Sequence, residues 1–237
     1  MELNKIYNED CLVGMKKIPD ASVDLIATDV PYRITSRGNA GSSGGMMQKD
    51  LSMKGKIFED NDIKIEEYLP EFYRILKDKS HCYIMCNHIN LTHFLKVIDE
   101  SNFHFIKCLV WVKDNKIMGS FYMNQFEYII MLRKGGERKT SITAESPMFL
   151  CSQTRKIKIK TDKTFTIVKS QSVYFRRLFL KAAKKGETIL DPFMGSGTTA
   201  IAAIREKRNF IGFELNKEYY DKACKRIKLE MMHPSLF

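Results

Sequence analysis

Short apolar runs alternate with amphipathic stretches along most of this chain. The runs that predict strands cover residues 3–7, 22–28, 82–86, 103–112, 126–132, 187–190 and 209–214. The stretches with apolar positions at helical spacing cover residues 11–17, 63–77, 91–98, 172–184, 198–208 and 216–230. Because helices alternate with strands apolar enough to be buried, the pattern predicts an α/β fold, with a mostly parallel sheet and helices on both faces.

The helix predicted over residues 63–77 contains a proline. Pro70 lacks an N–H group and its ring clashes with the preceding turn, so we expect it to divide this helix in two. Asp62 stands just before the stretch, where an acidic residue can cap a helix. Asn90 stands in the same position before the helix over residues 91–98.

Two segments depart from the pattern of strands and helices, and the first of them, residues 33–61, lacks any periodicity. Residues 33–61 predict a mobile loop that a ligand orders, although a disordered insertion without a role fits the same composition. Residues 133–170 are rich in basic side chains, and residues 154–160 alternate basic with apolar residues, as an edge strand does. Lysines on an edge strand also serve only to prevent aggregation, so this pattern alone assigns no function.

Composition narrows the class of protein. The 237 residues are 44% hydrophobic, enough for one sizeable core, and we expect a single domain over residues 1–237. The formal charge of +11 and the pI of about 9.3 favour an acidic partner, nucleic acid first. We find no run long enough to span a membrane and no signal-peptide pattern. The six cysteines follow no disulfide framework, so a reducing cytoplasm is the expected compartment.

A glycine turn follows the apolar run that ends at Leu190. The strand, the turn with Gly195 and Gly197, and the helix that starts at Thr198 are the parts of a nucleotide-binding βα unit. Glycine lets the backbone turn sharply and approach a ligand, and the helix start turns its N–H groups towards a negative group. The spacing is not GxGxxG, and a plain strand-to-helix turn remains the alternative.

An acidic residue ends the next predicted strand. Glu214 lies about 20 residues after the glycines, where a carboxylate can accept hydrogen bonds from a ribose. The alternative is an acid that caps the helix starting near Lys217. Together, the glycine turn and Glu214 predict a cofactor that contains adenosine.

The run Asp29-Val30-Pro31-Tyr32 follows the second predicted strand, at the end where open α/β sheets bind ligands. Asp29 and the Val30 carbonyl could each accept one hydrogen of an exocyclic amino group. Tyr32 could stack on a planar base, a contact worth about 1–3 kcal/mol. An aspartate that starts a proline turn explains the same four residues equally well.

Histidines and cysteines gather in the run from His81 to His88. Zinc sites use such ligands, but no paired CxxC supports one here. The alternation instead predicts a strand with Cys82, Ile84 and Cys86 on one face. We expect no metal ion.

The chain resembles the β group of DNA methyltransferases that methylate exocyclic amino groups with S-adenosylmethionine. Asp29-Val30-Pro31-Tyr32 is similar to their D/N/S-P-P-Y/F motif, and residues 191–197, Asp-Pro-Phe-Met-Gly-Ser-Gly, match the DPFxGSG form of their cofactor loop. The catalytic motif precedes the cofactor loop, which is the permuted order of that group. The resemblance therefore implies a Rossmann-like methyltransferase fold with a circularly permuted motif order.

The resemblance assigns roles to particular residues. Asp29, Val30, Pro31 and Tyr32 are implied to be catalytic and to hold the target base. Those implied to bind S-adenosylmethionine, with S-adenosylhomocysteine as product, are Asp10, Cys11, Asp29, Asp191, Pro192, Phe193, Gly195, Ser196, Gly197, Thr198, Glu214 and Leu215. Among these, Glu214 would hold the ribose and Asp10 the adenine amino group. Residues 133–170 stand where the family keeps its target-recognition region.

An aspartate in the first catalytic position implies adenine N6 as the target, with cytosine N4 as the alternative. The implied partner is double-stranded DNA, in a bacterial or phage-type cytoplasm near the nucleoid and away from membranes. A homodimer and a cognate restriction endonuclease are left open.

This chain departs from the family pattern in two places. Val30 replaces a proline, and residues 168–173 keep only Gln171 of the family's HPTQKP segment. The alternatives are therefore a catalytically silent DNA-binding protein, or a methyltransferase acting on RNA or a small molecule.

Overall fold

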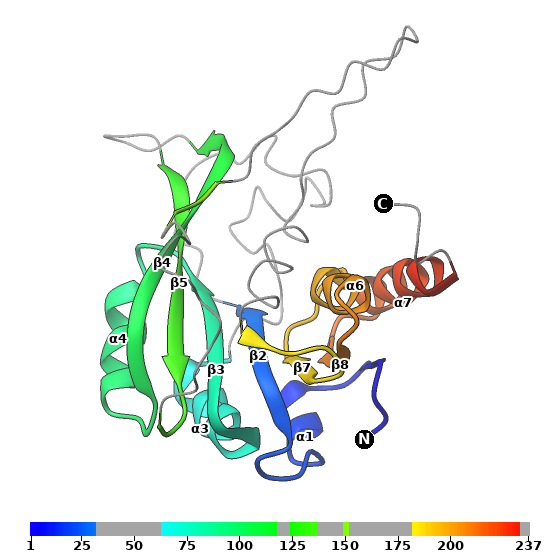
Figure 1. The fold of residues 1–237 in the computed structure, drawn as a ribbon. Helices are drawn as coiled ribbons and strands as arrows, with labels where there is room; N and C mark the ends of the chain where they lie inside the picture. Colours follow the sequence, from blue (N-terminus) through cyan, green and yellow to red (C-terminus); the bar gives the residue numbers. More distant parts are fainter. Residues whose placement is uncertain (32–62, 118–123, 137–148, 152–181, 233–237) are drawn as a thin grey trace, which may run out of the picture.

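The computed structural model describes residues 1–31, 63–117, 124–136, 149–151 and 182–232. Within these ranges, eight strands form one sheet in the order β1-β8-β7-β2-β3-β5-β4-β6 (Figure 1). The strands are β1 Lys5–Tyr7, β2 Val23–Asp29, β3 Leu76–Cys86, β4 His104–Ile117, β5 Asn124–Arg133, β6 Phe149–Cys151, β7 Thr188–Asp191 and β8 Asn209–Phe213. The helices described are α1 Cys11–Met15, α3 Ile65–Ile75, α4 Leu91–Asp99, α6 Thr198–Arg205 and α7 Lys217–Met232.

The sheet is mostly parallel, as predicted. Strands β1, β8, β7, β2 and β3 pair in parallel, and β6 pairs in parallel with β4. Among the described strands only β5 runs the other way, because it is antiparallel to both of its neighbours, β3 and β4. The carboxyl ends of the five parallel strands therefore meet at one edge of the sheet.

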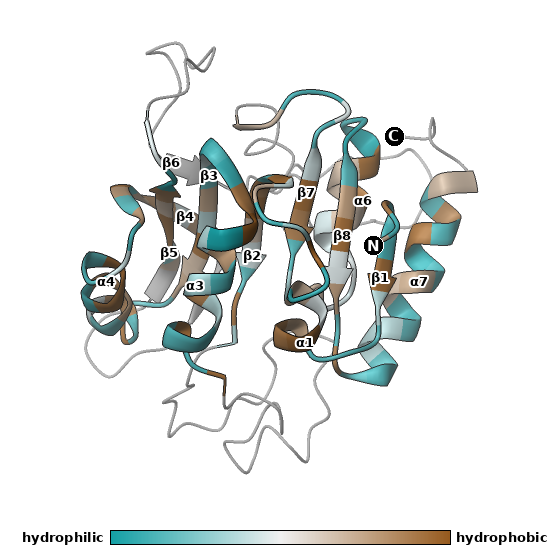
Figure 2. Ribbon diagram, turned by 90° about the horizontal axis from the view of Figure 1, so that it is seen from below, coloured by the Kyte–Doolittle hydropathy of each residue, from teal (hydrophilic) through white to brown (hydrophobic). Residues whose placement is uncertain are grey.

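Helices cover both faces of the sheet, which confirms the predicted layers (Figure 2). On one face, α1, α3 and α4 pack over the core that contains Phe72, Phe94 and Phe213. On the other face, α6 and α7 pack over the core that contains Phe210 and Ile227. Both faces of the central strands are buried, which explains their nearly continuous apolar sequences.

The direction in which the chain adds new strands to the sheet reverses between β2 and β7. From β2 the chain proceeds to the neighbouring strand β3 on one side, and from β7 it proceeds to β8 on the other side. The connecting helices, α3 and α6, lie on opposite faces of the sheet. In an open α/β sheet, ligands bind outside the carboxyl ends of the strands at such a switch point.

Helix α3 differs from its prediction in three ways, the first at Pro70 and the other two at its ends. Pro70 lies inside α3 and does not divide it. A proline in a helix interior costs about 3 kcal/mol, whereas burying one large apolar side chain gains about 1.5–3 kcal/mol. Five side chains on both sides of Pro70 are buried on one face of α3, namely Ile65, Tyr68, Leu69, Phe72 and Ile75. Their burial outweighs the lost hydrogen bond.

Both ends of α3 also differ from the prediction. The residue at the N-terminal cap is Lys64, not Asp62, and its N–H donates to the Glu67 carboxylate at 2.7 Å. The helix ends at Ile75 instead of Lys77, because Leu76 is extended and begins β3, where it pairs with Val23. Lys134 Nζ donates to the carbonyls of Tyr73 at 2.6 Å and Leu76 at 2.7 Å at this end. A cation that bonds the last carbonyls of a helix stabilises its end.

Several predictions fall outside the described residues. They are the loop over residues 33–61, the edge strand over residues 154–160 and all but the last residues of the helix over residues 172–184. Within the segment 133–170, the structure describes strand β6, which the sequence pattern did not predict. None of the described helices is both long and apolar enough to cross a membrane.

Helix α1 packs so closely on β8 that one position tolerates only glycine. A Cβ atom on Gly14 would lie 2.1 Å from Phe213 Cε1, and the Phe213 ring is fully buried.

We expect Gly14→Ala to lower the free energy of unfolding by about 1–3 kcal/mol, as overpacking a core does. Urea unfolding measures this effect. Val13→Ala, at an exposed neighbouring position, is the control and should change stability by less than about 0.5 kcal/mol; equal stability of the Gly14 variant and the wild type would contradict the packing.

Candidate active site

The residues with predicted roles lie after the carboxyl ends of four adjacent strands. Asp10 and Cys11 follow β1, Glu214 follows β8, the glycine turn follows β7, and Asp29 ends β2. Because β1, β8, β7 and β2 are neighbours in this order, the structure places all four groups along one edge of the sheet. Tyr32, the last residue of the predicted catalytic run, lies outside the described residues.

The glycine turn is a closed β-turn. The Gly197 N–H donates to the Met194 carbonyl at 3.0 Å, and Gly195 at the first central position has a φ of +54°. Only glycine adopts a positive φ there without strain. Nothing in the described part of the chain lies within 4 Å of the position that a Cβ on Gly195 would take, so this side of the turn is open.

The last residue of β8 and the residue after it hold the glycine turn. The Met194 N–H donates to the Phe213 carbonyl at 2.8 Å, and the Gly195 N–H donates to Glu214 Oε2 at 2.7 Å. Glu214 Oε1 accepts the N–H of Asn216 at 2.8 Å. These two N–H groups fix the Glu214 carboxylate beside the turn. The structure therefore brings together the two features that predicted an adenosine-containing cofactor.

Asp191 lies beneath the turn and is 3% exposed. Its Oδ1 accepts the Thr28 hydroxyl at 2.7 Å and the Phe193 N–H at 3.1 Å, and its carboxylate also bonds the Thr199 side chain. These three donors come from β2, from the turn and from the first turn of α6. Asp191 thus ties the end of β2 to the turn that follows β7.

Burial dominates the titration of this carboxylate. Loss of solvation raises the pKa of Asp191 from 3.8 to about 6, although the hydrogen bonds from Thr199, Thr28 and Phe193 each act to lower it. Three donors only partly replace the water that a charged carboxylate loses in the interior.

The run predicted to be catalytic begins where β2 leaves the sheet. Asp29 is half-buried and is the partner of Met85 on β3, while Thr28 before it bonds Asp191. Val30 is buried at 2% exposure and belongs to the core beneath α1 and α3. A residue before proline is restricted to extended conformations, which limits the direction of the Val30 carbonyl. Pro31 is half-buried.

The groups after β1 have structural partners as well. Asp10 is exposed and caps α1, since its Oδ1 accepts the N–H groups of Leu12 at 2.7 Å and Val13 at 3.3 Å. Cys11 is buried, and burial, followed by the charge of Asp10, raises the pKa of its thiol to about 12. Cys11 is therefore neutral at physiological pH and forms an apolar wall instead of acting as a nucleophile.

Aromatic packing sets the position of Phe193. Its ring lies edge-on to Tyr68 of α3, with ring centroids 5.5 Å apart. Tyr68 is itself buried against Phe72 at 4.9 Å. Of the remaining predicted residues, Pro192 is buried, Thr198 begins α6, and Leu215 is 50% exposed at the rim.

Three residues with clear structural roles in the site were missed from the sequence. Thr28 bonds Asp191, Asn8 donates to the carbonyls of Glu214 at 2.8 Å and Leu215 at 3.0 Å, and Arg226 of α7 donates to Ser196. Thr28 had a signal in the sequence, because it is a polar residue inside an apolar strand. Asn8 and Arg226 act through contacts that local spacing does not reveal.

The cysteines of β3 belong to the core. Cys82, Ile84 and Cys86 lie in the same buried cluster, as the alternation predicted. Burial raises the pKa of both thiols, that of Cys86 to about 12. In the described parts of the chain, no three His, Cys, Asp or Glu side chains are grouped so that they could hold a metal ion.

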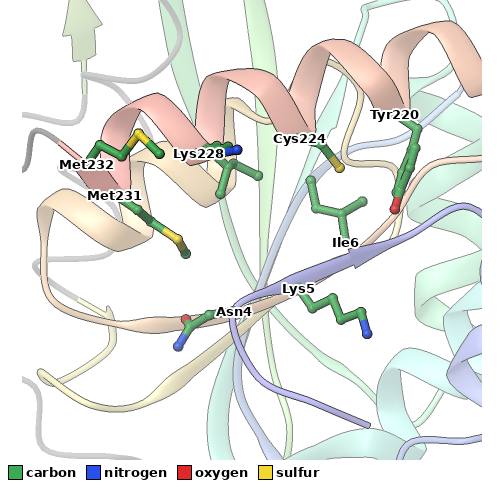
Figure 3. Close-up of a pocket in the computed structure, with 9 residues that line it drawn as sticks. Asn4, Lys5, Ile6, Tyr220, Cys224, Lys228, Met231 and Met232 are labelled. Carbon is green, nitrogen blue, oxygen red and sulfur yellow. The ribbon is translucent and has the colours of Figure 1, made fainter.

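A cavity of about 370 Å³ lies elsewhere, between β1 and α7 (Figure 3). Side chains of α7 extend there towards the edge strand. The lining consists of Asn4, Lys5, Ile6, Tyr220, Cys224, Ile227, Lys228, Met231 and Met232. None of these residues carries a predicted role, so this cavity is separate from the candidate active site.

Comparison with known proteins gives this arrangement a family context. A family model described as DNA methylase, of the N6 and N4 type, matches residues 23–225. The type II methyltransferase M.HinfI of Haemophilus influenzae is 26% identical over 246 residues, which cover 95% of this chain and 68% of that protein.

Solved structures share the fold. The crystal structure of an M1.HpyAVI–SAM complex matches with a TM-score of 0.65 and 22% identity, over 94% of this chain and 98% of that one. The PvuII DNA methyltransferase, described as cytosine-N4-specific, matches with a TM-score of 0.66 and 15% identity, over 97% of this chain and 91% of that one.

The pKa of Asp191 predicts how stability depends on pH. Since its folded pKa of about 6 exceeds the ordinary 3.8, the native state binds more protons than the unfolded state between these values. The contribution of Asp191 to the free energy of unfolding is therefore lost as pH rises through this window, by at most about 1.4 kcal/mol per pH unit. We expect Asp191→Asn to remove this dependence, so that the variant gains stability relative to the wild type from pH 4 to pH 7.

Urea unfolding at pH 4, 5, 6 and 7 measures the effect. The matched control is Asp99→Asn, which changes an exposed carboxylate on α4 and should leave the pH profile unchanged. Parallel profiles for Asp191→Asn and the wild type would show that burial does not raise this pKa.

Proposed function

The chain belongs to the family of DNA methylases that modify exocyclic amino groups, and from this premise we propose that it transfers a methyl group from S-adenosylmethionine to adenine N6 in double-stranded DNA. The observation that carries the proposal is the contact between β2 and β7. The Thr28 hydroxyl and the Asp191 carboxylate, 2.7 Å apart, connect the strand that ends in Asp29 to the turn that contains Gly195. Donor and acceptor sites on these two strand ends would face one crevice.

The residues of the turn suit the proposed cofactor. Among the described residues, none lies within 4 Å of the position that a Cβ on Gly195 would take, and the Glu214 carboxylate beside it would accept hydrogen bonds from ribose hydroxyls. Phe193 and the buried thiol of Cys11 offer apolar surface. When bound, S-adenosylmethionine would supply the methyl group as a sulfonium. The relative M1.HpyAVI was solved as a complex with SAM, which supports this assignment.

Asp29 and Val30 would act on the target base. The lone pair of an exocyclic amino nitrogen is delocalised into the ring, which makes it a poor nucleophile. If the Asp29 carboxylate and the Val30 carbonyl each accept one amino hydrogen, the nitrogen becomes pyramidal and its lone pair points at the methyl group. The carboxylate would stabilise the positive charge that develops on nitrogen as the sulfonium C–S bond breaks and S-adenosylhomocysteine leaves, and positioning lowers the barrier further. The methylated amino group would then lose one proton to solvent, which gives the neutral product.

The base must leave the duplex to reach this site, at a cost of a few kcal/mol, roughly. We propose that residues 33–61 close over the flipped base and that the basic segment 133–170 recognises the target sequence. Both segments would belong to the same single domain as the site. A bacterial cytoplasm, at the nucleoid, is the compartment that provides this substrate. The homodimer and the restriction endonuclease partner remain predictions.

The choice of adenine rests on the aspartate at position 29. Among the relatives, the PvuII enzyme is described as cytosine-N4-specific, and both bases present an amino group in the same geometry. We expect DNA from a methylation-free host that expresses this protein to contain N6-methyladenine after digestion to nucleosides. N4-methylcytosine alone would assign the other base, and unmodified DNA would favour a catalytically silent DNA-binding protein.

Replacement of Asp29 tests the mechanism directly. We expect Asp29→Ala to lower the rate of methyl transfer by at least about 10²-fold, because the group that stabilises the developing charge is lost. S-adenosylmethionine binding, measured by calorimetry, should be kept, with a Kd that changes far less than the rate. Asp99→Ala removes an exposed carboxylate from α4 and serves as the control. Turnover retained in the Asp29 variant would remove this residue from the mechanism.

A further inference from the structure

The C-terminal helix reaches the glycine turn through one charged side chain. Arg226 of α7 donates from Nη1 to the carbonyl of Ser196 at 2.5 Å and to its hydroxyl at 2.8 Å. The two residues are 30 positions apart in the chain. Hydrogen bonds from a charged donor are roughly twice as strong as neutral ones, so this is a substantial constraint on the turn.

The backbone of α7 also contacts the turn. A Cβ atom on Gly197 would lie 3.1 Å from the Cβ and 3.3 Å from the Cα of Ala223. Gly197 has a φ of +85° and occupies the cap position of α6. Ala223 and Arg226 are three positions apart and therefore share one face of α7. This face contacts the turn at two adjacent residues.

Arg226 completes the set of bonds that define the turn. Glu214 holds the N–H of Gly195, the Met194 carbonyl holds the N–H of Gly197, and Arg226 holds the carbonyl of Ser196. Fixing the Ser196 carbonyl fixes the plane of the peptide that enters α6. The first N–H groups of that helix have no intrahelical partners and are the groups that face an incoming ligand.

We propose that Arg226 is a positioning residue for the cofactor turn, and that it sets cofactor affinity by holding Ser196. This inference rests on the proposed function, since it concerns the same cofactor. The charge that α7 places under the turn also adds to the positive end of α6, which favours a ligand with a negative group. Burial and the nearby Arg205 lower the pKa of Arg226 while Glu230 raises it, and the guanidinium stays charged at physiological pH.

The test compares calorimetric Kd values for S-adenosylmethionine and S-adenosylhomocysteine. Arg226→Met keeps an unbranched apolar side chain in place of the aliphatic stem and removes the guanidinium donors, and we expect it to weaken binding by about tenfold. The KM for the cofactor should rise, while kcat at saturating cofactor and the KM for DNA stay near wild type. Arg226→Lys keeps the charge but loses the planar fork, and we expect a loss of about threefold.

Two controls separate positioning from packing. Lys225→Met removes an exposed charge from the neighbouring position of α7 and should leave binding unchanged. Arg205→Met breaks the ion pair between α6 and Glu230 of α7, at 2.6 and 2.7 Å, without touching Ser196. If Arg205→Met weakens binding as much as Arg226→Met does, the effect comes from general contact between the helices and the proposal is overturned.

The outcomes also distinguish this inference from the proposed function. A wild type that binds neither cofactor form would overturn both. A wild type that binds them, together with an Arg226→Met variant of equal affinity, would overturn only the role of Arg226. If the melting temperature of the ligand-free Arg226→Met variant falls, its loss of affinity could come from lower stability. The Arg226→Lys variant then separates lower stability from lost positioning of Ser196, because it keeps a cation at this position.

Discussion

A buried carboxylate joins β2 and β7, the two parallel strands between which the strand order reverses. Asp191 accepts hydrogen bonds from Thr28 of β2, from the backbone of Phe193 in the turn and from Thr199 of α6. At the opposite end of the same strands, Asp24 accepts the N–H of Thr188 at 2.9 Å. Polar ties at both ends therefore fix β2 against β7 where the backbone pairing itself is short. The relative position of the proposed catalytic and cofactor-binding residues depends on this junction.

The cost of this arrangement shows in the pKa of Asp191. A carboxylate in the interior loses its hydration, and three donors recover only part of that free energy. The protein keeps an expensive group in the core because it bonds three elements at once. An apolar residue at position 191 would pack there without joining the strand, the turn and the helix.

The glycine turn is held from two sides by residues distant in sequence. Glu214, just after β8, accepts the N–H of Gly195, and Arg226 of α7 donates to the Ser196 carbonyl. In the part of the chain that the structure describes, the space that a Cβ on Gly195 would take is open. A turn whose own groups are satisfied by protein partners is preorganised, so binding a ligand there costs little rearrangement. The proposed methyl transfer, which depends on the distance between donor and acceptor, benefits from the same rigidity.

The sequence by itself determined the layers of this fold and the edge at which the site lies. Alternating strands and helices require a mostly parallel sheet, and parallel strands place all their carboxyl ends on one edge. The residues after four such strands, among them Asp29, Gly195 and Glu214, could therefore be placed together without coordinates. The family motifs narrowed the chemistry to one class of reaction, which the match over residues 23–225 bears out.

Only the tertiary structure decided which of these residues are held by the protein itself. Pro70 stays within α3 because the burial of the surrounding apolar face outweighs one lost hydrogen bond. Asp191 is buried beneath the turn and not at its surface, and Arg226 supports the turn from another helix. Thr28 and Asp191 are 163 positions apart in the chain. Periodicity and spacing report only neighbours along the chain, whereas these contacts depend on how the elements pack against one another in space.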